Sequence, residues 1–221
     1  YYDNDGQAVE GFLPDGVRMM LTGQVFAIMG QVADKQQIAA IARSADHYLY
    51  QPEIGGYRLN TDFAELKFNL GRMFGFAYGE KENGAVFSHM TVMYANALYR
   101  RGFAKEGWKA LKTLADAALH FETSRIYPGI PEYFSSDGRG MYHYLTGAAS
   151  WFMLTMITEV FGVRGEAGDH RPAVGGRPGQ LAADRSGRNL PRHHPGASAD
   201  PAADRLLRRG RAQHLPPAGC R

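Results

Sequence analysis

The apolar and polar positions of the chain alternate between two kinds of segment. Residues 21–32 are apolar or small on most sides, whereas residues 34–50 keep their apolar side chains on one stripe at helical spacing. The same pair recurs at 86–101 and 104–119, and a third apolar segment spans 145–161. Helices that are apolar all round are buried on several sides, and amphipathic helices cover them from outside. The pattern therefore predicts an all-α fold of paired inner and outer helices, which suits an α/α barrel.

The loops separate this barrel from its structural rival, a helical-repeat solenoid. The stretch from Gln51 to Asn83 contains proline and glycine, so we expect it to be mostly loop with a short helical piece at 63–70. A solenoid joins its helices through turns of roughly 2–8 residues, which are much shorter. Long loops rich in glycine, aromatic and charged residues usually carry function at one mouth of a scaffold.

The charge of the chain divides sharply at Asp169. The 221 residues carry 25 Lys and Arg against 22 Asp and Glu, a net charge of +3. Residues 170–221 contain 10 Arg, no Lys, 3 Asp and no Glu, so they carry +7 and the remainder carries −4. All 26 aromatic residues precede this tail. The basic balance belongs to the tail, so it gives no support to nucleic-acid binding by the body.

The tail cannot form a core of its own. It holds 7 of the 11 prolines and no Ile, Met or aromatic residue, so it cannot bury enough apolar surface to offset its chain entropy. We predict a helical domain at 1–168 and a disordered, low-complexity tail at 169–221. The abundance of Arg, Pro, Ala and Gly without Lys also fits a GC-rich coding sequence read in a shifted frame, which resequencing across 165–175 would test.

Targeting, redox and metal signals are sparse. The chain opens on Tyr1-Tyr2-Asp3 without a signal peptide, and no apolar run approaches the roughly 18 residues of a membrane span. Its only cysteine, Cys220, lies in the tail, so the body has no disulfide and no thiolate metal site. No metal-ligand spacing or nucleotide-binding loop occurs. We expect an internal fragment of a larger cytoplasmic protein that needs no metal and no organic cofactor.

Three segments hold residues suited to chemistry. Tyr2-Asp3-Asn4-Asp5-Gly6 has the composition of an Asx turn, which is its simplest interpretation. His89 enters the first turn of an apolar helix, either as a core histidine bonded to a backbone carbonyl or as a group that helps free N–H groups hold an anion. In the segment Pro128–Trp151, Thr146 and Gly147 stand at a helix start, which fits either close helix packing or a phosphate cradle.

These segments resemble the glycoside phosphorylases of glycoside hydrolase family 94. The similarity covers residues 1–168 and is carried by Tyr2–Gly6, Lys81–His89 and Pro131–Trp151 in that order. The last stretch is most similar to 1,2-β-oligoglucan phosphorylases and to the C-terminal region of cyclic β-1,2-glucan synthases. The resemblance implies a parent with a β-sandwich, a linker, an (α/α)6 barrel and a small C-terminal β domain. Residues 1–168 would then form the second half of that barrel.

The resemblance also implies roles for individual residues. The general acid of the family falls on Asp3, with Asp5 as the alternative register. The phosphate ligands fall on His89 and on the pair Thr146 and Gly147, while a further phosphate-binding arginine would lie upstream. The residues expected to line the sugar subsites are Glu132, Tyr133 and Glu82. The partners would be a β-glucan oligosaccharide and inorganic phosphate, the latter as co-substrate.

The implied activity is inverting phosphorolysis of a β-glucosidic linkage, most closely that of a β-1,2-glucan, to give α-glucose 1-phosphate. Phosphate replaces the activated water of an inverting hydrolase, so an anion site takes the place of the second carboxylate. Asp3 would have to stay protonated near neutral pH, which needs a pKa raised by burial. The fragment alone is expected to be inactive, and a homodimer of the parent stays open.

Three other interpretations stay open. An inverting hydrolase on the same barrel would need a catalytic base and would turn over without phosphate. A non-catalytic, carbohydrate-binding or chain-length-controlling module would belong to a membrane-attached glucan synthase. A helical interaction scaffold would bind neither phosphate nor glucan. Nucleic acid is not an expected partner in any of them.

Overall fold

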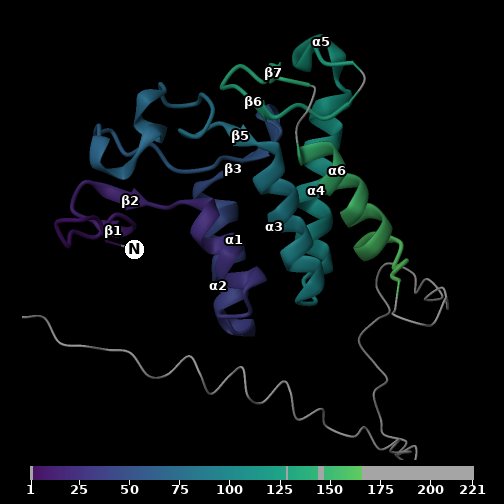
Figure 1. The fold of residues 1–221 in the computed structure, drawn as a ribbon, viewed down its shortest axis with the longest axis horizontal. Helices are drawn as coiled ribbons and strands as arrows, with labels where there is room; N and C mark the ends of the chain where they lie inside the picture. The colour runs from purple at the N-terminus through teal and green to yellow at the C-terminus, as the bar shows by residue number, and fades with distance from the viewer. Residues whose placement is uncertain (1, 128, 144–146, 166–221) are drawn as a thin grey trace, which may run out of the picture. The chain divides into compact units, whose positions relative to one another are not determined.

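The computed structural model describes residues 2–127, 129–143 and 147–165, and helices dominate these ranges (Figure 1). The helices are α1 (Leu21–Met29), α2 (Lys35–Tyr48), α3 (Ser88–Arg100), α4 (Ala104–Leu119), α5 (Phe121–Ser124) and α6 (Gly147–Thr155). A π-helical turn, Met156–Val160, continues α6. The five helices expected from the sequence are confirmed to within a few residues wherever their ends are described, and the short α5 is new.

Side-chain caps explain where α1 ends and where α2 begins. The Asp34 carboxylate accepts the backbone N–H of Gln37, and the Gln37 side chain accepts the backbone N–H of Asp34, both at 2.8 Å. This reciprocal capping box satisfies two of the N–H groups that a helix start leaves free. At the other end, the Arg101 guanidinium donates to the carbonyls of Ile28 at 3.0 Å and Ala33 at 2.8 Å. The residue that follows α3 therefore binds the C-terminal end of α1.

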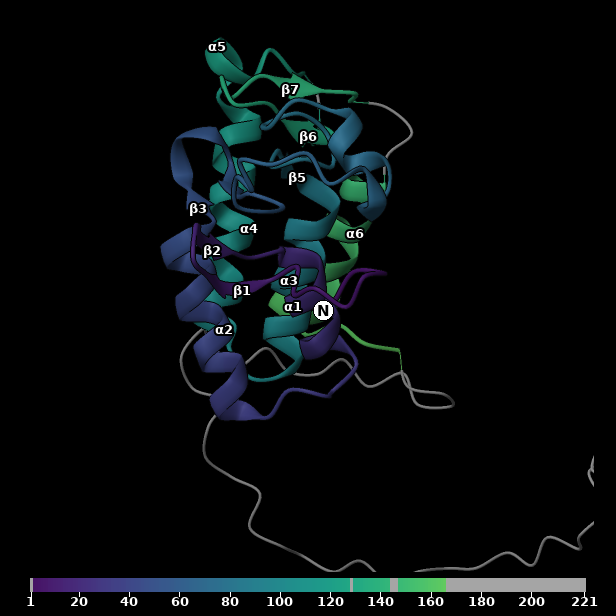
Figure 2. The ribbon, with the colours of Figure 1, turned by 90° about the vertical axis from the view of Figure 1, so that its left-hand side faces the viewer.

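The most buried helix is α3, and it occupies the centre. It packs against α1, α4 and α6, while α2 packs against α1 (Figures 1 and 2). The helices α1, α3 and α6 are the apolar segments of the sequence, and α2 and α4 are the amphipathic ones. In α2 one stripe of Ile38, Ala42 and Ala45 is buried. The expected alternation of apolar and amphipathic helices is confirmed for this part of the chain.

Trp108 departs from the hydrophobic pattern of α4. The sequence pattern places Trp108 inward together with Leu111 and Leu114, but 44% of the Trp108 residue surface is exposed, whereas the two leucines are fully buried. The reason lies in its neighbour. A Cβ on Gly107 would lie 2.6 Å from the Tyr99 ring of α3, so α4 approaches α3 through its small residues. With the small residues of α4 turned toward α3, the Trp108 indole faces outward.

Short strands correct the all-α expectation. They are β1 (Gly11–Leu13), β2 (Gly16–Arg18), β3 (Tyr50–Gln51), β4 (Gly56–Tyr57), β5 (Val86–Phe87), β6 (Tyr133–Phe134) and β7 (Gly140–Met141). They form the antiparallel pairs β1–β2 and β3–β4 and the three-stranded sheet β5-β6-β7. Such strands of two or three residues are too short to show an alternating pattern in the sequence. The expected helical piece at 63–70 is instead two 3₁₀ turns, Phe68–Leu70 and Arg72–Gly75, and a third, Pro52–Ile54, joins β3 to β4.

The apolar interior consists of two clusters of very different size. The larger lies among the helices and reaches the sheet at Phe134, and it includes the fully buried Leu21, Ile38 and Leu98. The smaller lies under the β1–β2 hairpin and the 62–75 loop and is built from Val9, Phe63, Met73 and Phe74. The two clusters support different parts of the candidate site.

Several expectations fall outside what the structure describes. The chain divides into the units Tyr1–Gly175 and Gly176–Arg221, and the second unit lies outside the described residues, as does almost all of the tail predicted at 169–221. The boundary at 168 and the closure of an (α/α)6 barrel stay predictions. Among the described residues, none of the helices is long and apolar enough to cross a membrane.

Candidate functional site

A small sheet fixes the start of α3. Strand β5 leads directly into the helix, whose first residue is Ser88. The Ser88 N–H donates to the Glu132 carbonyl at 2.9 Å, and Phe87 lies opposite Tyr133 in the sheet. The order of strand and helix therefore brings the N-terminal end of α3 next to two residues expected to line a sugar subsite.

His89 and Gly147 meet where two helices begin. His89 lies in the first turn of α3, and Gly147 is the first residue of α6. A Cβ on Gly147 would lie 2.8 Å from Cε1 of His89 and 3.0 Å from Nδ1, so a larger residue would displace the imidazole. Trp151 covers another side of the imidazole, with 5.7 Å between the ring centroids. The positive ends of two helix dipoles thus converge here, which favours an anion.

Three buried polar atoms at this place have no hydrogen-bond partner among the described residues. They are Ser88 Oγ, His89 Nε2 and Thr91 Oγ1. An unpaired buried polar group costs about 1–3 kcal/mol, so such a cluster points to a polar ligand. We call Ser88, His89, Thr91 and Gly147 the helix-terminus site. Burial lowers the pKa of His89, so its imidazole is neutral at pH 7 and donates one N–H.

The two sequence-based interpretations of His89 can now be compared. A core histidine would bond a backbone carbonyl, but Nε2 has no such partner within the described ranges. The contact with Gly147 confirms that the two residues lie together. Thr146, the third residue expected at this place, lies outside the described residues.

Two sugar-subsite candidates, Glu132 just before β6 and Tyr133 in β6, are held differently. Tyr133 is buried, its hydroxyl donates to Glu80 Oε2 at 3.1 Å, and its ring stacks on Phe87 with 6.2 Å between centroids. Burial, together with the hydrogen bond to Glu80, raises the pKa of Tyr133. Glu132 is half-buried and its backbone N–H bonds to the β7 side of the sheet. The Tyr133 side chain is therefore fixed in place, while the Glu132 carboxylate has no hydrogen bond or ion pair to another described residue.

Glu82 belongs to a cluster of charges and rings beside the sheet. Its carboxylate pairs with Arg72 at 3.1 Å. The Lys81 ammonium lies 4.6 Å from the centre of the Tyr142 ring, and both Lys81 and Tyr142 have positive φ angles of 46° and 54°. Strained backbone at two residues in contact often marks a functional place. Sequence reasoning missed Lys81, although it directly precedes Glu82 in a segment already singled out.

Asp3 corrects one expectation. Its Oδ1 accepts the backbone N–H groups of Asp5 at 3.0 Å and Gln7 at 2.8 Å, which is the Asx turn proposed as its simplest interpretation. Asp3 is half-buried, and the hydrogen bond from the Gln7 backbone, helped by those from Asp5 and Asn69, holds the pKa of its carboxyl group below 3.8. Its partial burial acts in the opposite direction but does not raise the pKa above the ordinary value. We call Asp3–Gln7 the acid turn; Asp5 contributes its backbone N–H.

The structure therefore gathers some of the predicted residues and separates another. His89, Gly147, Glu132 and Tyr133 lie around the start of α3. Within the described part of the chain, the Asp3 side chain bonds instead to its own turn and to Asn69 of the 62–75 loop. The candidate site thus has two halves, the helix-terminus site and the acid turn, on different supports.

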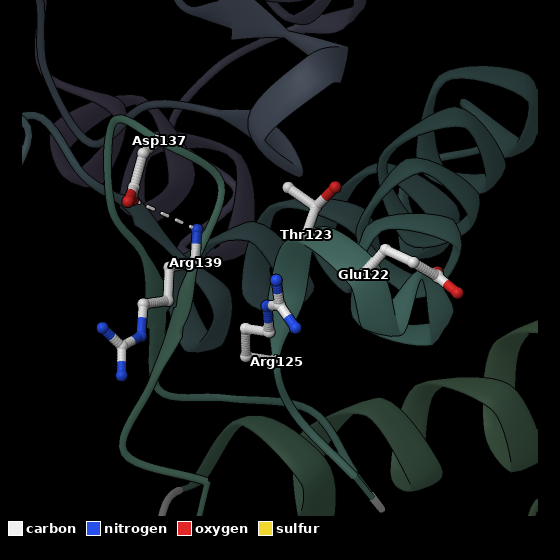
Figure 3. Close-up of a pocket in the computed structure, with 5 residues that line it drawn as sticks. All are labelled: Glu122, Thr123, Arg125, Asp137 and Arg139. Carbon is white, nitrogen blue, oxygen red and sulfur yellow. Dashed lines mark hydrogen bonds between the residues drawn. The ribbon is translucent and has the colours of Figure 1, made fainter.

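A cavity among the described residues lies elsewhere. It has a volume of about 630 Å³ and lies between α5 and the tip of the β6–β7 hairpin (Figure 3). Its lining residues are Glu122, Thr123, Arg125, Asp137 and Arg139. The lining contains two arginines and two carboxylates, so its formal charges cancel. None of the predicted residues lines it, and converging donors are a stronger sign of chemistry than open volume. In the described ranges no cluster of His, Cys, Asp and Glu could hold a metal ion.

Two helix starts with buried polar groups that lack a partner among the described residues, and a carboxyl group on a separate turn, are compatible with a carbohydrate-active catalytic domain. The family described as "Glycosyl hydrolase 94 superfamily, catalytic domain" matches residues 1–162. The chain belongs to this family.

Two curated proteins are similar to the chain. A cellobionic acid phosphorylase of Neurospora crassa is 24% identical over 163 residues, which are 67% of this chain and 20% of that protein. A 3-O-β-D-glucopyranosyl-β-D-glucuronide phosphorylase of Paenibacillus borealis is 22% identical over 175 residues, 75% of this chain and 22% of that protein. The chain therefore spans about a fifth of the length of these relatives.

Proposed function

We propose that this chain supplies the phosphate site and the proton donor of an inverting glycoside phosphorylase. The observation that carries the proposal is the buried Nε2 of His89, which has no partner among the described residues and lies against Gly147 where α3 and α6 begin. Phosphate is an anion that must be held before it can attack, and helix N-termini with a neutral imidazole provide donors for it. The two curated relatives, both named phosphorylases, support the same activity.

The proposed reaction uses one acid and one anion site. An oxygen of inorganic phosphate forms a bond to the anomeric carbon while the bond from that carbon to the leaving sugar oxygen breaks. Asp3 gives its proton to that leaving oxygen, so the products are α-glucose 1-phosphate and the shortened sugar. Phosphate attacks from the face opposite the leaving group, which inverts the configuration. A second catalytic carboxylate is unnecessary because phosphate does the work of the activated water.

For Asp3 to act near neutral pH, bound sugar has to change its surroundings. Asp3 is only half-buried in the described chain, and its turn favours the ionised form. A sugar that covers it removes water from the carboxylate, and such desolvation raises the pKa of an acid. Substrate binding would therefore favour the protonated form of the Asp3 carboxyl group.

The substrate and the scaffold are proposed on narrower support. We assign a β-1,2-glucan as the substrate because Pro131–Trp151 resembles enzymes of that linkage, and we assign Glu132, Tyr133 and Glu82 to its subsites. The helices would be half of an (α/α)6 barrel. Support comes from apolar side chains exposed on α1 and α6, the two helices that flank α3: Phe26, Met153 and Leu154.

Replacement of Asp3 by Asn tests the proton donor. In the enzyme at its natural length, D3N should lower kcat for phosphorolysis of β-1,2-glucooligosaccharides about a thousandfold, because general acid catalysis contributes roughly 10²–10⁴. The fold should persist, since Asn also accepts the N–H groups of the turn. The product α-glucose 1-phosphate is followed by phosphorus NMR. The matched control is D34N, a change in another exposed aspartate that accepts a backbone N–H, and it should keep full activity.

The same assay separates phosphorolysis from its alternatives. Wild-type activity in D3N would contradict the assignment of Asp3. Sugar release at full rate without phosphate would show a hydrolase instead. Cellobiose cleaved faster than a β-1,2-linked disaccharide would overturn the linkage and leave the phosphorylase assignment intact.

A further inference from the structure

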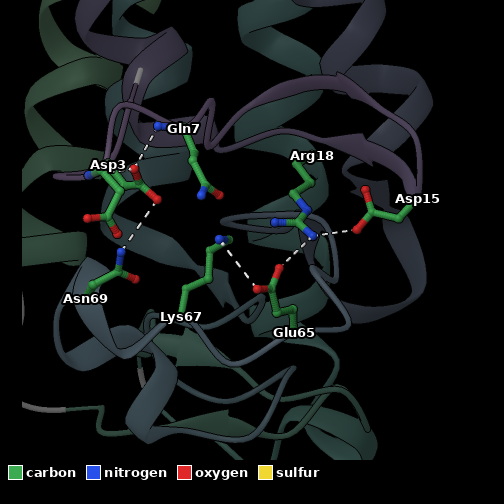
Figure 4. A network of polar contacts seen from close by, with 8 residues as sticks. Asp3, Gln7, Asp15, Arg18, Glu65, Lys67 and Asn69 are labelled. Atoms are coloured by element: carbon green, nitrogen blue, oxygen red, sulfur yellow. Dashed lines mark hydrogen bonds and ion pairs between the residues drawn. The ribbon is translucent and has the colours of Figure 1, made fainter.

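A chain of charged groups runs through the 62–75 loop toward the acid turn (Figure 4). It begins at Arg18, at the end of β2, whose residue surface is only 7% exposed. The guanidinium lies 2.5 Å from Asp15 Oδ2 and 2.9 Å from Glu65 Oε2, and it covers the Phe63 ring at 5.2 Å. The hairpin and the loop are thereby joined at a buried cation above the smaller apolar cluster.

Glu65 also forms an ion pair with Lys67. Its second oxygen, Oε1, lies 3.5 Å from the Lys67 ammonium, whose side chain is only 11% exposed. One carboxylate therefore serves two cations, so the charge of Lys67 is only partly balanced. In Figure 4 Lys67 stands between the Arg18–Glu65 pair and the group formed by Asp3, Gln7 and Asn69. Hydrogen bonds, first of all the one from the Gln7 backbone, do most to lower the pKa of Asp3, and the charge of Lys67 adds a smaller effect in the same direction.

The two oxygens of Asp3 have different partners. Oδ1 accepts two backbone N–H groups of its own turn, from Asp5 and Gln7. Oδ2 faces the side-chain amide of Asn69 at 3.5 Å. Contacts to a catalytic group are often long before substrate binds and shorten afterwards. Oδ2 is thus the oxygen left to carry and release a proton, and Asn69 fixes its direction.

We propose that Lys67 and Asn69 are positioning residues for the proton-donating oxygen of Asp3, a role that rests on the proposed function of that carboxyl group. Asn69 holds the plane of the carboxyl group so that Oδ2 points at the leaving oxygen. Lys67 stabilises the carboxylate that remains after the proton has left. Arg18 and Glu65 act one step further away, because they hold the loop and the lysine in place.

Two measurements test this assignment together. The first is a carbon NMR titration of the Asp3 carboxyl in the full chain, assigned with D3N. The second is the pH profile of kcat for phosphorolysis by the enzyme at its natural length. The variants are K67M and N69A, with K67R as the rescue. K112M is the matched control, because Lys112 also pairs with a carboxylate, Asp116, but on the distant α4.

The expected results are specific to positioning. K67M should raise the pKa of Asp3 and move the alkaline limb of the kcat profile to higher pH by the same amount, since the acid must be protonated to act. K67R should restore both, and K112M should change neither. N69A should lower kcat about fivefold, the effect of one lost hydrogen bond, and leave the KM for phosphate unchanged.

Two results overturn the assignment, and they differ in what else they remove. An Asp3 pKa that is the same in wild type, K67M and N69A would overturn the positioning roles while leaving the phosphorylase proposal intact. An Asp3 pKa that rises in K67M while the alkaline limb stays fixed would show that Asp3 is not the proton donor. That second result removes the catalytic role of Asp3 and the positioning roles with it.

Discussion

The helix-terminus site and the acid turn differ in what holds them. His89 and Gly147 stand over the large apolar cluster of the helix bundle, and their geometry is set by close packing in which a single added carbon does not fit. Asp3 is held by hydrogen bonds within its own turn and from Asn69, while the ion pair of Arg18 and Glu65 ties down the neighbouring loop beside a cluster of four buried residues. One half is buried, neutral and packed, and the other is charged and lies near the surface.

This difference matches what each half is proposed to do. A phosphate site gains from fixed donors in dry surroundings, where electrostatic interactions are strong. A proton donor must change its protonation state in every turnover, so its surroundings have to favour both forms at different moments. Changes in volume should therefore damage the first half, and changes in charge should damage the second.

The largest effect is expected from volume at Gly147. G147A places a methyl group 2.8 Å from Cε1 of His89, so the imidazole must move. The free energy of unfolding should fall by about 1–3 kcal/mol, the usual cost of overpacking. The KM for phosphate should rise about tenfold or more with a smaller change in kcat, because the ground-state contact to phosphate is lost.

Urea unfolding and initial-rate kinetics measure these two effects. The matched control is G75A, where an added Cβ meets nothing within 4 Å. If G147A binds phosphate as the wild type does, tight packing against His89 is not what shapes the anion site.

A smaller effect is expected from charge at Arg18. R18M keeps an apolar side chain over Phe63 but leaves Asp15 and Glu65 without their shared cation. Both carboxylates are more than half exposed and can be hydrated, so the free energy of unfolding should fall by only about 1 kcal/mol. Hydrogen exchange should quicken at the Gln7 amide and stay unchanged in α3.

Exchange NMR reads both places in one sample, and R43M, at an exposed arginine of α2, serves as the control. Equal acceleration in α3 and in the acid turn would contradict the separation into two supports.

The smallest effect concerns pH, and the two halves should respond in different windows. The folded pKa of His89 lies below its ordinary 6.5 because of burial, so the unfolded chain binds the proton more readily. Its contribution to stability is therefore complete above pH 6.5 and is lost as the pH falls below that value. The folded pKa of Asp3 lies below 3.8, so its contribution is present above pH 3.8 and lost only at lower pH.

Urea unfolding at pH 7.5 and 5.5 measures the contribution of His89 to the free energy of unfolding. H89Q should lose less stability between these two values than the wild type, whereas H120Q, a change at an exposed histidine, should lose as much as the wild type. An identical pH dependence in H89Q and the wild type would show that His89 is not desolvated.

The sequence predicts the helices and the helix-terminus site far better than the acid turn. Periodicity locates α1, α2, α3, α4 and α6 because each segment buries a continuous stripe or surface, and the motif residues His89 and Gly147 meet as expected. Trp108 is the exception, since the rotation of α4 depends on the tight approach of Gly107 to Tyr99, which a hydrophobic pattern does not record.

The acid turn depends on contacts that no local sequence pattern predicts. The strands β1 and β2 are too short to show periodicity, and Lys67 and Asn69 approach Asp3 from more than sixty positions along the chain. The expectation of a buried, raised-pKa aspartate follows from the demands of the reaction, whereas the lowered pKa of Asp3 follows from its Asx turn. The composition of Asp3–Gly6 by itself predicts this turn, and with it the lowered pKa.

The central claim is that phosphate binds at the helix-terminus site while Asp3 stands apart from it as the acid. The most direct measurement is a titration of the full chain with inorganic phosphate, followed by nitrogen NMR at the His89 imidazole and the Gly147 amide. The account predicts saturable chemical-shift changes at both residues and none at the Asp3 amide. A sulfate-free chloride salt of equal ionic strength should cause none of these changes. Shifts at Asp3 without shifts at His89 and Gly147 would contradict it.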